Sequence, residues 1–143
     1  ELLIEGGLGY QDAEYTKLDQ NLIVEVSKKD DFIRTPERSW NLGASYMINL
    51  SNGGRITPRF DWVYKSEIQY EPVNNDDVAG DSYNRLNLSV AFEPNDNLKF
   101  TLGVNNVTDE EYIIAGDSNN VLGYSLVVYE RPRNWYLTAE YSF

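Results

Sequence analysis

Hydrophobic and polar residues alternate along much of this chain with a period of two. The alternation is clearest over residues 55–70, where one parity carries no charge and the other carries the charged side chains. The uncharged set is Ile56, Pro58, Phe60, Trp62, Tyr64, Ser66, Ile68 and Tyr70, and the other set is Arg55, Thr57, Arg59, Asp61, Val63, Lys65, Glu67 and Gln69. Because successive side chains of a β-strand point to opposite faces, this stretch predicts a strand with one apolar and one polar face.

Five further segments show the same period. Three of them carry alternating apolar residues at Trp40, Leu42, Ala44, Tyr46, Ile48 and Leu50, at Leu86, Leu88, Val90 and Phe92, and at Leu98, Phe100, Leu102 and Val104. The segment at residues 2–10 is interrupted by Leu3 and by three glycines, which weaken a strand pattern. The last segment is residues 131–143. We therefore predict an all-β fold, an antiparallel meander of about six strands.

The connections between these segments alternate in length. Residues 51–54 and 94–97 are short and rich in Gly or Asn, which allow the positive φ values of tight turns. Residues 16–36, 71–81 and 108–130 are long and read as polar, solvated links. Short turns at one end of a sheet and long loops at the other are typical of an outer-membrane β-barrel.

The final segment has two chemically distinct faces and ends on an aromatic residue. One face carries Trp135, Leu137, Ala139, Tyr141 and Phe143, and the other carries Asn134, Tyr136, Thr138, Glu140 and Ser142. In lipid, strands satisfy their backbone hydrogen bonds only in a closed barrel, and such barrels carry aromatic girdles at both interfaces. The pattern therefore predicts a transmembrane β-barrel, and a function in membrane transport or assembly.

The composition is compatible with this prediction. Hydrophobic residues make up 41% of the 143 residues, and apolar runs such as residues 112–115 end after four positions. A spanning helix needs about 20 apolar residues in a row, whereas a barrel strand needs only alternation. The length fits one domain, and residue 1 is not Met, so we expect a mature chain or a fragment of a longer one.

Charge and missing residue types narrow the function. The net charge of -11 argues against nucleic acid as a partner, because phosphates demand a basic face. Without His or Cys the chain lacks the usual general base, thiol nucleophile and imidazole ligand, and Asp109 and Glu111 lie on an exposed loop. We expect no enzyme, no cofactor and no metal site. The acidic residues of the loop 71–81, which are Glu71, Asp76, Asp77 and Asp81, lack the spacing of an EF-hand and read as solvated rather than as a calcium or cation site.

Two motifs resemble one family. Residues 104–112, Val-Asn-Asn-Val-Thr-Asp-Glu-Glu-Tyr, resemble the N-[LV]-T-D-x-x-Y signature near the end of TonB-dependent outer-membrane receptors, and residues 131–143 resemble their closing P-R-x-[WY] strand with its aromatic terminus. Residues 8–15 and 35–37 are similar to upstream pieces in the same order. The resemblance covers essentially the whole chain.

This resemblance implies a 22-stranded barrel with an N-terminal plug, in the outer membrane of Gram-negative bacteria. Such receptors take up scarce ligands, with ferric siderophores the class we expect, using energy delivered through TonB. Residues 1–143 would be the C-terminal portion, with the plug, the TonB-contacting segment and the earlier strands absent. The implied partners are outer-membrane lipid, the rest of the barrel and plug, TonB and the barrel-assembly machinery.

Three sets of residues are candidates for function. The family motif supplies Asn106, Thr108, Asp109 and Tyr112; the terminal strand and assembly signal supplies Trp135, Leu137, Tyr141 and Phe143; and the barrel lumen would be lined by Arg55, Arg59, Asp61, Lys65 and Glu67. Each set also has a structural interpretation. Residues 108–111 could form a capping box that begins one helical turn, the terminal residues could simply face lipid, and the charged residues could pair across neighbouring strands.

Two other classes of protein stay open at this point. The first is a self-contained small β protein, either a soluble sandwich or an eight-stranded membrane barrel, with a structural or binding role. Six strands fit it poorly, because a single-chain bacterial barrel needs at least about eight. The second is an outer-membrane hydrolase, which the missing His and Cys make the weakest of the three.

Overall fold

The computed structural model describes residues 1–19, 21 and 26–143 and confirms the all-β prediction. Its strands are β1 (Leu2–Tyr10), β2 (Arg38–Tyr46), β3 (Ile48–Asn49), β4 (Arg55–Lys65), β5 (Tyr83–Asn95), β6 (Leu98–Asn105), β7 (Ile113–Asn119), β8 (Tyr124–Tyr129) and β9 (Asn134–Tyr141). One antiparallel sheet runs in the order β1-β2-β4-β5-β6-β9, and β3 extends β2 along β4. The predicted meander of six strands is therefore present. None of the residues described here forms a helix that is long and apolar enough to cross a membrane.

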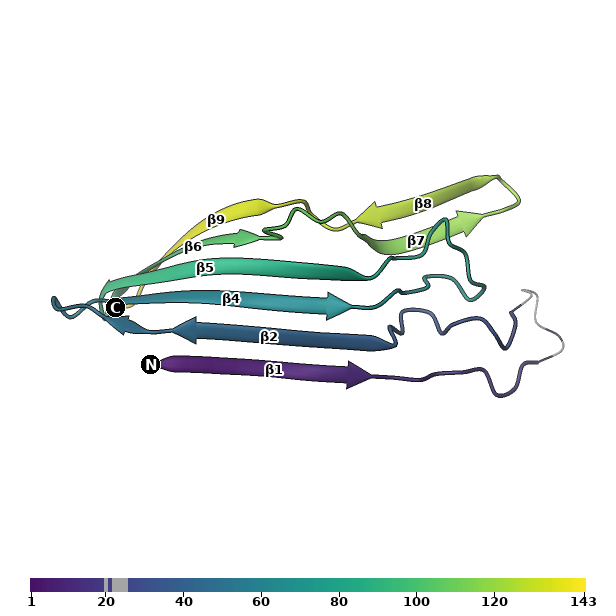
Figure 1. Ribbon diagram of the computed structural model, residues 1–143. Coiled ribbons are helices and arrows are strands. Elements are labelled where there is room, and N and C mark those ends of the chain that lie inside the picture. The colour runs from purple at the N-terminus through teal and green to yellow at the C-terminus, as the bar shows by residue number, and fades with distance from the viewer. Residues whose placement is uncertain (20, 22–25) are drawn as a thin grey trace.

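The two ends of this sheet differ. Figure 1 shows the short turns after β3 and β5 at one end, together with both termini, and the long connections at the other. Gly53 adopts a φ of 86° in the first short turn, a value that glycine reaches without steric cost. The prediction of alternating short and long connections is confirmed. We call the two ends the turn end and the loop end.

The strand register separates the side chains into two faces. One row across the sheet is Ala44, Phe60, Leu88, Val104 and Trp135, and the next is Ser45, Arg59, Ser89, Gly103 and Tyr136. Neighbouring rows point to opposite sides because the strand period is two. The sheet thus has an apolar face and a polar face over its whole width.

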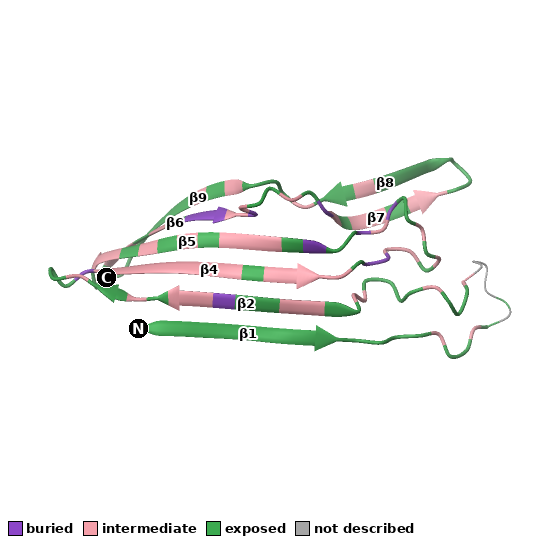
Figure 2. Cartoon of the chain, viewed as in Figure 1, coloured by how far each residue is buried: buried purple, intermediate pink, exposed green. Residues whose placement is uncertain are grey.

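The apolar face is not covered by other parts of the chain. Leu8 is 91% exposed, and Trp135 and Leu137 are each 70% exposed. Buried side chains gather instead at the loop end, where Figure 2 shows most of the purple segments. A face of this kind needs lipid or another protein against it, because monomeric soluble proteins rarely expose large apolar patches.

The strand predicted over residues 55–70 is too long. Strand β4 ends at Lys65, and Ile68 then forms an isolated bridge with Gly80, each donating its N–H to the other's carbonyl at 2.9 Å. Ile68 is buried there. Alternation continues past Lys65 because the segment stays extended, but it leaves the sheet to build the loop end.

The prediction that residues 108–130 form a solvated link is also wrong. This segment contains the antiparallel hairpin of β7 and β8, which closes through Gly123 at a φ of 70°. The sequence of β7, Ile-Ile-Ala-Gly-Asp-Ser-Asn, has no two-residue alternation, so the pattern could not indicate a strand. The hairpin gains its partners from another loop rather than from the sheet.

That loop is residues 71–81, and together they form a compact unit. Val78 is fully buried, and a Cβ at Gly116 would lie 2.3 Å from the Val78 carbonyl oxygen, so only glycine fits there. Tyr70 donates from its hydroxyl to the Ile113 carbonyl at 2.9 Å. We call residues 66–82 with 108–131 the outer lobe. The loop 71–81 is therefore packed rather than merely solvated.

Candidate functional site

The polar face carries an ion cluster in the middle of the sheet. Arg59 on β4 donates from Nε to Asp61 Oδ2 at 2.8 Å, and its Nη2 pairs with both Asp61 and Glu5 of β1. Gly43 lies between them on β2, where a Cβ would approach Arg59 Nη2 to 3.0 Å. The missing side chain lets the three charges meet across the intervening strand.

The other charged candidates are spread along the polar face. Arg55 at the turn end lies 3.4 Å from Glu93 and 3.3 Å from Asp96. Lys65 ends β4 at the loop end, opposite Tyr83. Glu67 lies beyond the strand and accepts a hydrogen bond from Gln69 Nε2 at 3.3 Å. The five candidates therefore do not converge on one site, and partly exposed pairs of this kind add about 0–1 kcal/mol each.

The family motif forms a compact, hydrogen-bonded turn between β6, the hairpin and β9. Asn106 is 2% exposed and has a φ of 52°; its Nδ2 donates to the carbonyls of Glu110 and Arg131, and its Oδ1 accepts from Glu110 N at 3.1 Å. Asp109, with a φ of 57°, accepts from Arg133 N at 2.7 Å. Thr108 between them is exposed.

The predicted helical turn over residues 108–111 is absent from this part of the described chain. Two residues with positive φ bend the backbone instead, and Asn and Asp are the side chains that tolerate this region best after glycine. Tyr112, the last motif residue, is buried and stacks on Tyr83 of β5 at 3.8 Å between ring centres. Burial raises the pKa of the Tyr112 hydroxyl, so it stays protonated at neutral pH.

A polar pocket lies beside this turn, on the polar face at the loop end. Its volume is about 300 Å³, and it is lined by Arg85, Asn87, Asn105, Asn106, Glu130, Arg131 and Asn134. We call it the wall pocket. Only Asn106 of this set was a candidate from the sequence. Arg85, Asn87, Asn105 and Asn134 could have been found by taking the polar-parity residues nearest the loop end of β5, β6 and β9. Glu130 and Arg131 lie in the link between β8 and β9, where strand parity gives no signal.

Two buried polar atoms at this position have no hydrogen-bond partner among the described residues. They are Arg85 Nε and the Tyr112 hydroxyl. Arg85 reaches Glu130 only through Nη1, at 3.6 Å from Oε2. Buried polar atoms without partners are rare in proteins, so both side chains are held here at a cost in free energy.

The outer lobe beside the wall pocket is held by a partly exposed carboxylate. Glu71 accepts hydrogen bonds from Ser118 N, from Ser118 Oγ at 2.8 Å and from Asn75 Nδ2 at 3.2 Å. Burial alone would raise the pKa of the Glu71 carboxyl, but these donors outweigh it and hold the pKa below its ordinary value. Asp76, Asp77 and Asp81 do not join it, and no group of acidic residues in the described chain could hold a metal ion.

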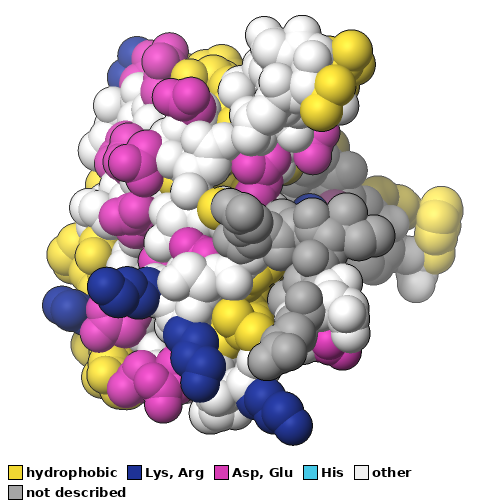
Figure 3. Space-filling model, turned by 90° about the vertical axis from the view of Figure 1, so that its right-hand side faces the viewer, with side chains coloured by type: hydrophobic (Ala, Val, Ile, Leu, Met, Phe, Trp, Pro, Cys, Tyr) yellow, Lys and Arg dark blue, Asp and Glu magenta, His cyan; other side chains and the backbone are white. Residues whose placement is uncertain are grey.

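Viewed from the loop end, the surface has mixed character. Figure 3 shows acidic side chains spread over this end, while most basic ones gather toward its lower left. The polar groups that could meet a ligand are therefore localised rather than uniform.

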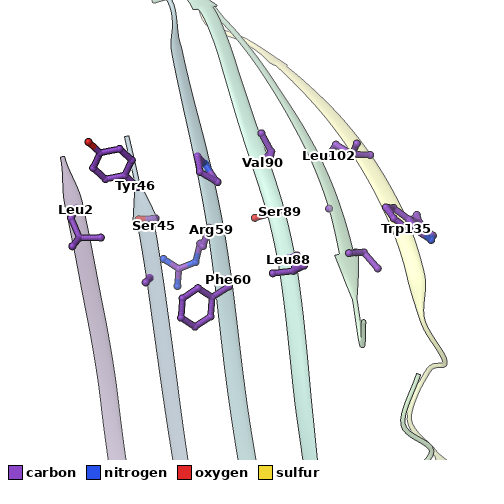
Figure 4. A pocket seen from close by; sticks show the side chains of 14 residues that line it. Leu2, Ser45, Tyr46, Arg59, Phe60, Leu88, Ser89, Val90, Leu102 and Trp135 are labelled. Carbon is purple, nitrogen blue, oxygen red and sulfur yellow. The ribbon is translucent and has the colours of Figure 1, made fainter. Parts of the chain in front are cut away.

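The apolar face carries a groove of about 630 Å³. Figure 4 shows the apolar side chains around it, which come from β1, β2, β4, β5, β6 and β9; they are Leu2, Tyr46, Phe60, Leu88, Val90, Leu102 and Trp135. Its lining has the chemistry of an acyl-chain surface and offers little that could orient a polar ligand.

The terminal strand closes one edge of the sheet. Trp135, Leu137 and Tyr141 are exposed on the apolar face, and Tyr141 packs edge-to-face on Phe143 at 5.1 Å between ring centres. Ser142 N donates to Asn97 O at 2.8 Å, which ties the terminus to the turn after β5. Strand β9 pairs only with β6, and β1 only with β2, so both edges of the described sheet are open.

Comparison with known proteins gives one family and one fold. Residues 2–107 match the family described as TonB dependent receptor-like, beta-barrel. Among solved structures, the chain is similar to BauA, the ferric preacinetobactin receptor from Acinetobacter baumannii, with 16% sequence identity and a TM-score of 0.73. The match covers 99% of this chain but 20% of the BauA chain, and at this identity it shows the fold alone. No curated protein matches.

Proposed function

The chain belongs to the TonB-dependent receptor β-barrel family, and from this premise we propose that it is the C-terminal part of an outer-membrane receptor for the active uptake of scarce ligands. The observation that carries the proposal is the six-strand meander with one bare apolar face and one polar face. In a closed barrel the first face meets lipid and the second faces the lumen.

The open edges support a place within a larger barrel. Strands β1 and β9 present unpaired backbone groups, which in lipid must be satisfied by neighbouring strands. We propose that the preceding barrel strand covers β1 and that the first strand of the barrel covers β9. A self-contained small protein would leave both edges and the apolar face exposed, and no feature of the structure favours it.

We propose ferric siderophores as the transported class and TonB as the energy source. BauA, which has the same fold over this region, is a ferric preacinetobactin receptor, and this supports the choice of class. The plug, the lumen wall and the outer lobe would enclose the ligand, and Arg59, Asp61 and Lys65 would line the lumen. Because the family is one of transport receptors, we propose no enzymatic role.

The test is uptake of ⁵⁵Fe-loaded siderophores by Gram-negative cells with the gene deleted, and by the same cells complemented with the full-length receptor. We expect uptake of at least one ferric complex to depend on the gene and to disappear in a TonB-deficient strain. Gene-independent uptake of every complex in a panel of catecholate, hydroxamate and carboxylate siderophores would remove the iron assignment. Outer-membrane fractionation would still test the barrel assignment.

A further inference from the structure

We propose that the wall pocket binds an oxyanion, a carboxylate in the first instance, of the transported ligand. The inference rests on the proposed function, since it assigns part of the ligand-binding surface of that receptor. Membership of the family does not indicate which chemical group of a ligand this pocket would bind.

The charge of the pocket is the first observation. Two basic residues, Arg85 and Arg131, and one acidic residue, Glu130, line the pocket within a chain of net charge -11. Glu130 already pairs with Arg85 Nη1 and accepts from the Arg131 main-chain N–H at 2.8 Å. Within the described residues the Arg131 guanidinium donates no hydrogen bond. The pocket is therefore cationic where most of the molecule is acidic, and it attracts an anion.

The second observation is the set of unused donors. Arg85 Nε is buried without an acceptor. Asn87 accepts from Asn106 N at 3.0 Å through its Oδ1, which turns its amide NH₂ away from Asn106. A carboxylate is an acceptor only, with two oxygens that suit a guanidinium and an amide donor.

The third observation is that the pocket is rigid before a ligand binds. Asn106 forms its floor and is fixed by four hydrogen bonds to residues of three segments. Asn105 donates from Nδ2 to Asn134 Oδ1 at 3.1 Å, which joins β6 to β9 at the rim. A site held in this way loses little conformational entropy on binding.

The experiment uses citrate as the probe and the purified full-length receptor. Calorimetry would measure citrate binding to the wild type, to Arg85→Gln and to Arg55→Gln. The last variant is a matched control, because it makes the same change on the same face at the turn end. We expect citrate to bind the wild type, Arg85→Gln to weaken it by at least about tenfold, and Arg55→Gln to change it by less than about twofold. Heat-modifiability on gels would confirm that both variants fold.

Labelling with phenylglyoxal, which modifies arginine, gives the second readout. We expect citrate to protect Arg85 and not Arg55, as read by peptide mass spectrometry. Equal labelling with and without citrate, or equal weakening by the two variants, would overturn the proposal. If Arg85 is protected before citrate is added and citrate changes nothing, a carboxylate of the receptor itself fills the pocket and the proposal is again overturned. Citrate protection in a receptor that takes up no ferric complex would refute the iron assignment and leave the pocket assignment standing.

Discussion

At the scale of single residues, the structure depends on places where a side chain is missing. Gly103 of β6 pairs with Tyr136 of β9, and a Cβ at Gly103 would lie 2.3 Å from Tyr136 Cζ. The tyrosine ring therefore lies over the glycine, an arrangement that strengthens a weak position in a strand. The same logic applies to Gly43, which opens the space for the ion cluster of Arg59, Asp61 and Glu5.

The Gly103→Ala variant should expose this dependence. The new methyl group displaces the Tyr136 ring, and we expect the full-length receptor to lose about 1–3 kcal/mol of unfolding free energy. Urea unfolding in detergent micelles would measure the loss. Gly103→Ala combined with Tyr136→Ala is the control, because the clash is then gone and the second substitution should cost less than it does alone. Additive losses would contradict the overlap.

At the residue scale, the sequence pattern predicted which face of the sheet a side chain occupies, but it did not predict most of the side chains that it contacts. Alternation placed Arg59 and Asp61 on the polar face, and it also indicated that such charges could pair. It did not indicate Glu5, because pairing three charges across β2 depends on Gly43 and on register. For the same reason the sequence singled out Asn106 but not Arg85 or Glu130, which meet it only after three segments converge.

At the scale of elements, the two faces of each strand should differ in their response to charge. Leu88 and Ser89 are neighbours on β5 and point to the apolar and the polar face. In the full-length receptor we expect Leu88→Arg to cost about 2–4 kcal/mol, the penalty for arginine at the bilayer midplane, and Ser89→Arg much less. Unfolding equilibria in lipid vesicles would compare them. Equal costs would be incompatible with one lipid-facing side.

The outer lobe should respond to pH through Glu71. Its folded pKa lies below the ordinary value of 4.5, so the ionised form is favoured by folding. The resulting stability is fully present above the unfolded pKa and is lost as pH falls through the folded pKa. We expect the hydrogen-exchange protection of residues 113–119, taken relative to the intrinsic rate at each pH, to fall in acid. Glu71→Gln should be less protected at neutral pH, with little further loss in acid. A wild-type lobe whose exchange protection did not change down to pH 3 would contradict this role.

The two-residue alternation alone was not sufficient to predict where every strand begins and ends. The long strands were predictable because their alternate residues have opposite chemistry, as a wall between lipid and lumen would require. Strands β7 and β8 were not, since they form a separate hairpin that packs on the loop 71–81, and β7 shows no two-residue alternation. The predicted end of β4 failed for the related reason that residues 66–70 remain extended after leaving the sheet.

At the scale of the whole molecule, the described residues form one sheet with a lobe at one end. Only a small number of side chains are buried, and most of them lie in the outer lobe rather than under the sheet. The fold class, the order of the strands in the sheet and the alternation of short and long connections followed from the sequence. The wall pocket did not, because it forms where loops meet strands.

The terminal aromatic residue gives a prediction at this scale. Phe143 lies outside β9 and contacts Tyr141, so its loss removes little from the sheet itself. If the barrel-assembly machinery reads this end, as we propose, deletion of Phe143 from the full-length receptor should lower the folded amount in the outer membrane without changing synthesis. Pulse-labelling followed by heat-modifiability on gels would separate the two. Unchanged folding would leave Phe143 as an ordinary lipid-facing residue.

The packing of the outer lobe has a consequence for how quickly the proposed receptor would capture a ligand. Because Val78 and Gly116 interlock and Glu71 ties two loops together, residues 71–81 and the hairpin cannot open one without the other. An entrance built from separate loops would sample many shapes and would have to be ordered by each arriving ligand. Here two loops already share one shape. If the outer lobe helps to enclose the ligand, as we propose, the search for a bound arrangement is confined to the remaining loops of the receptor, and recognition on this side approaches docking onto a fixed surface.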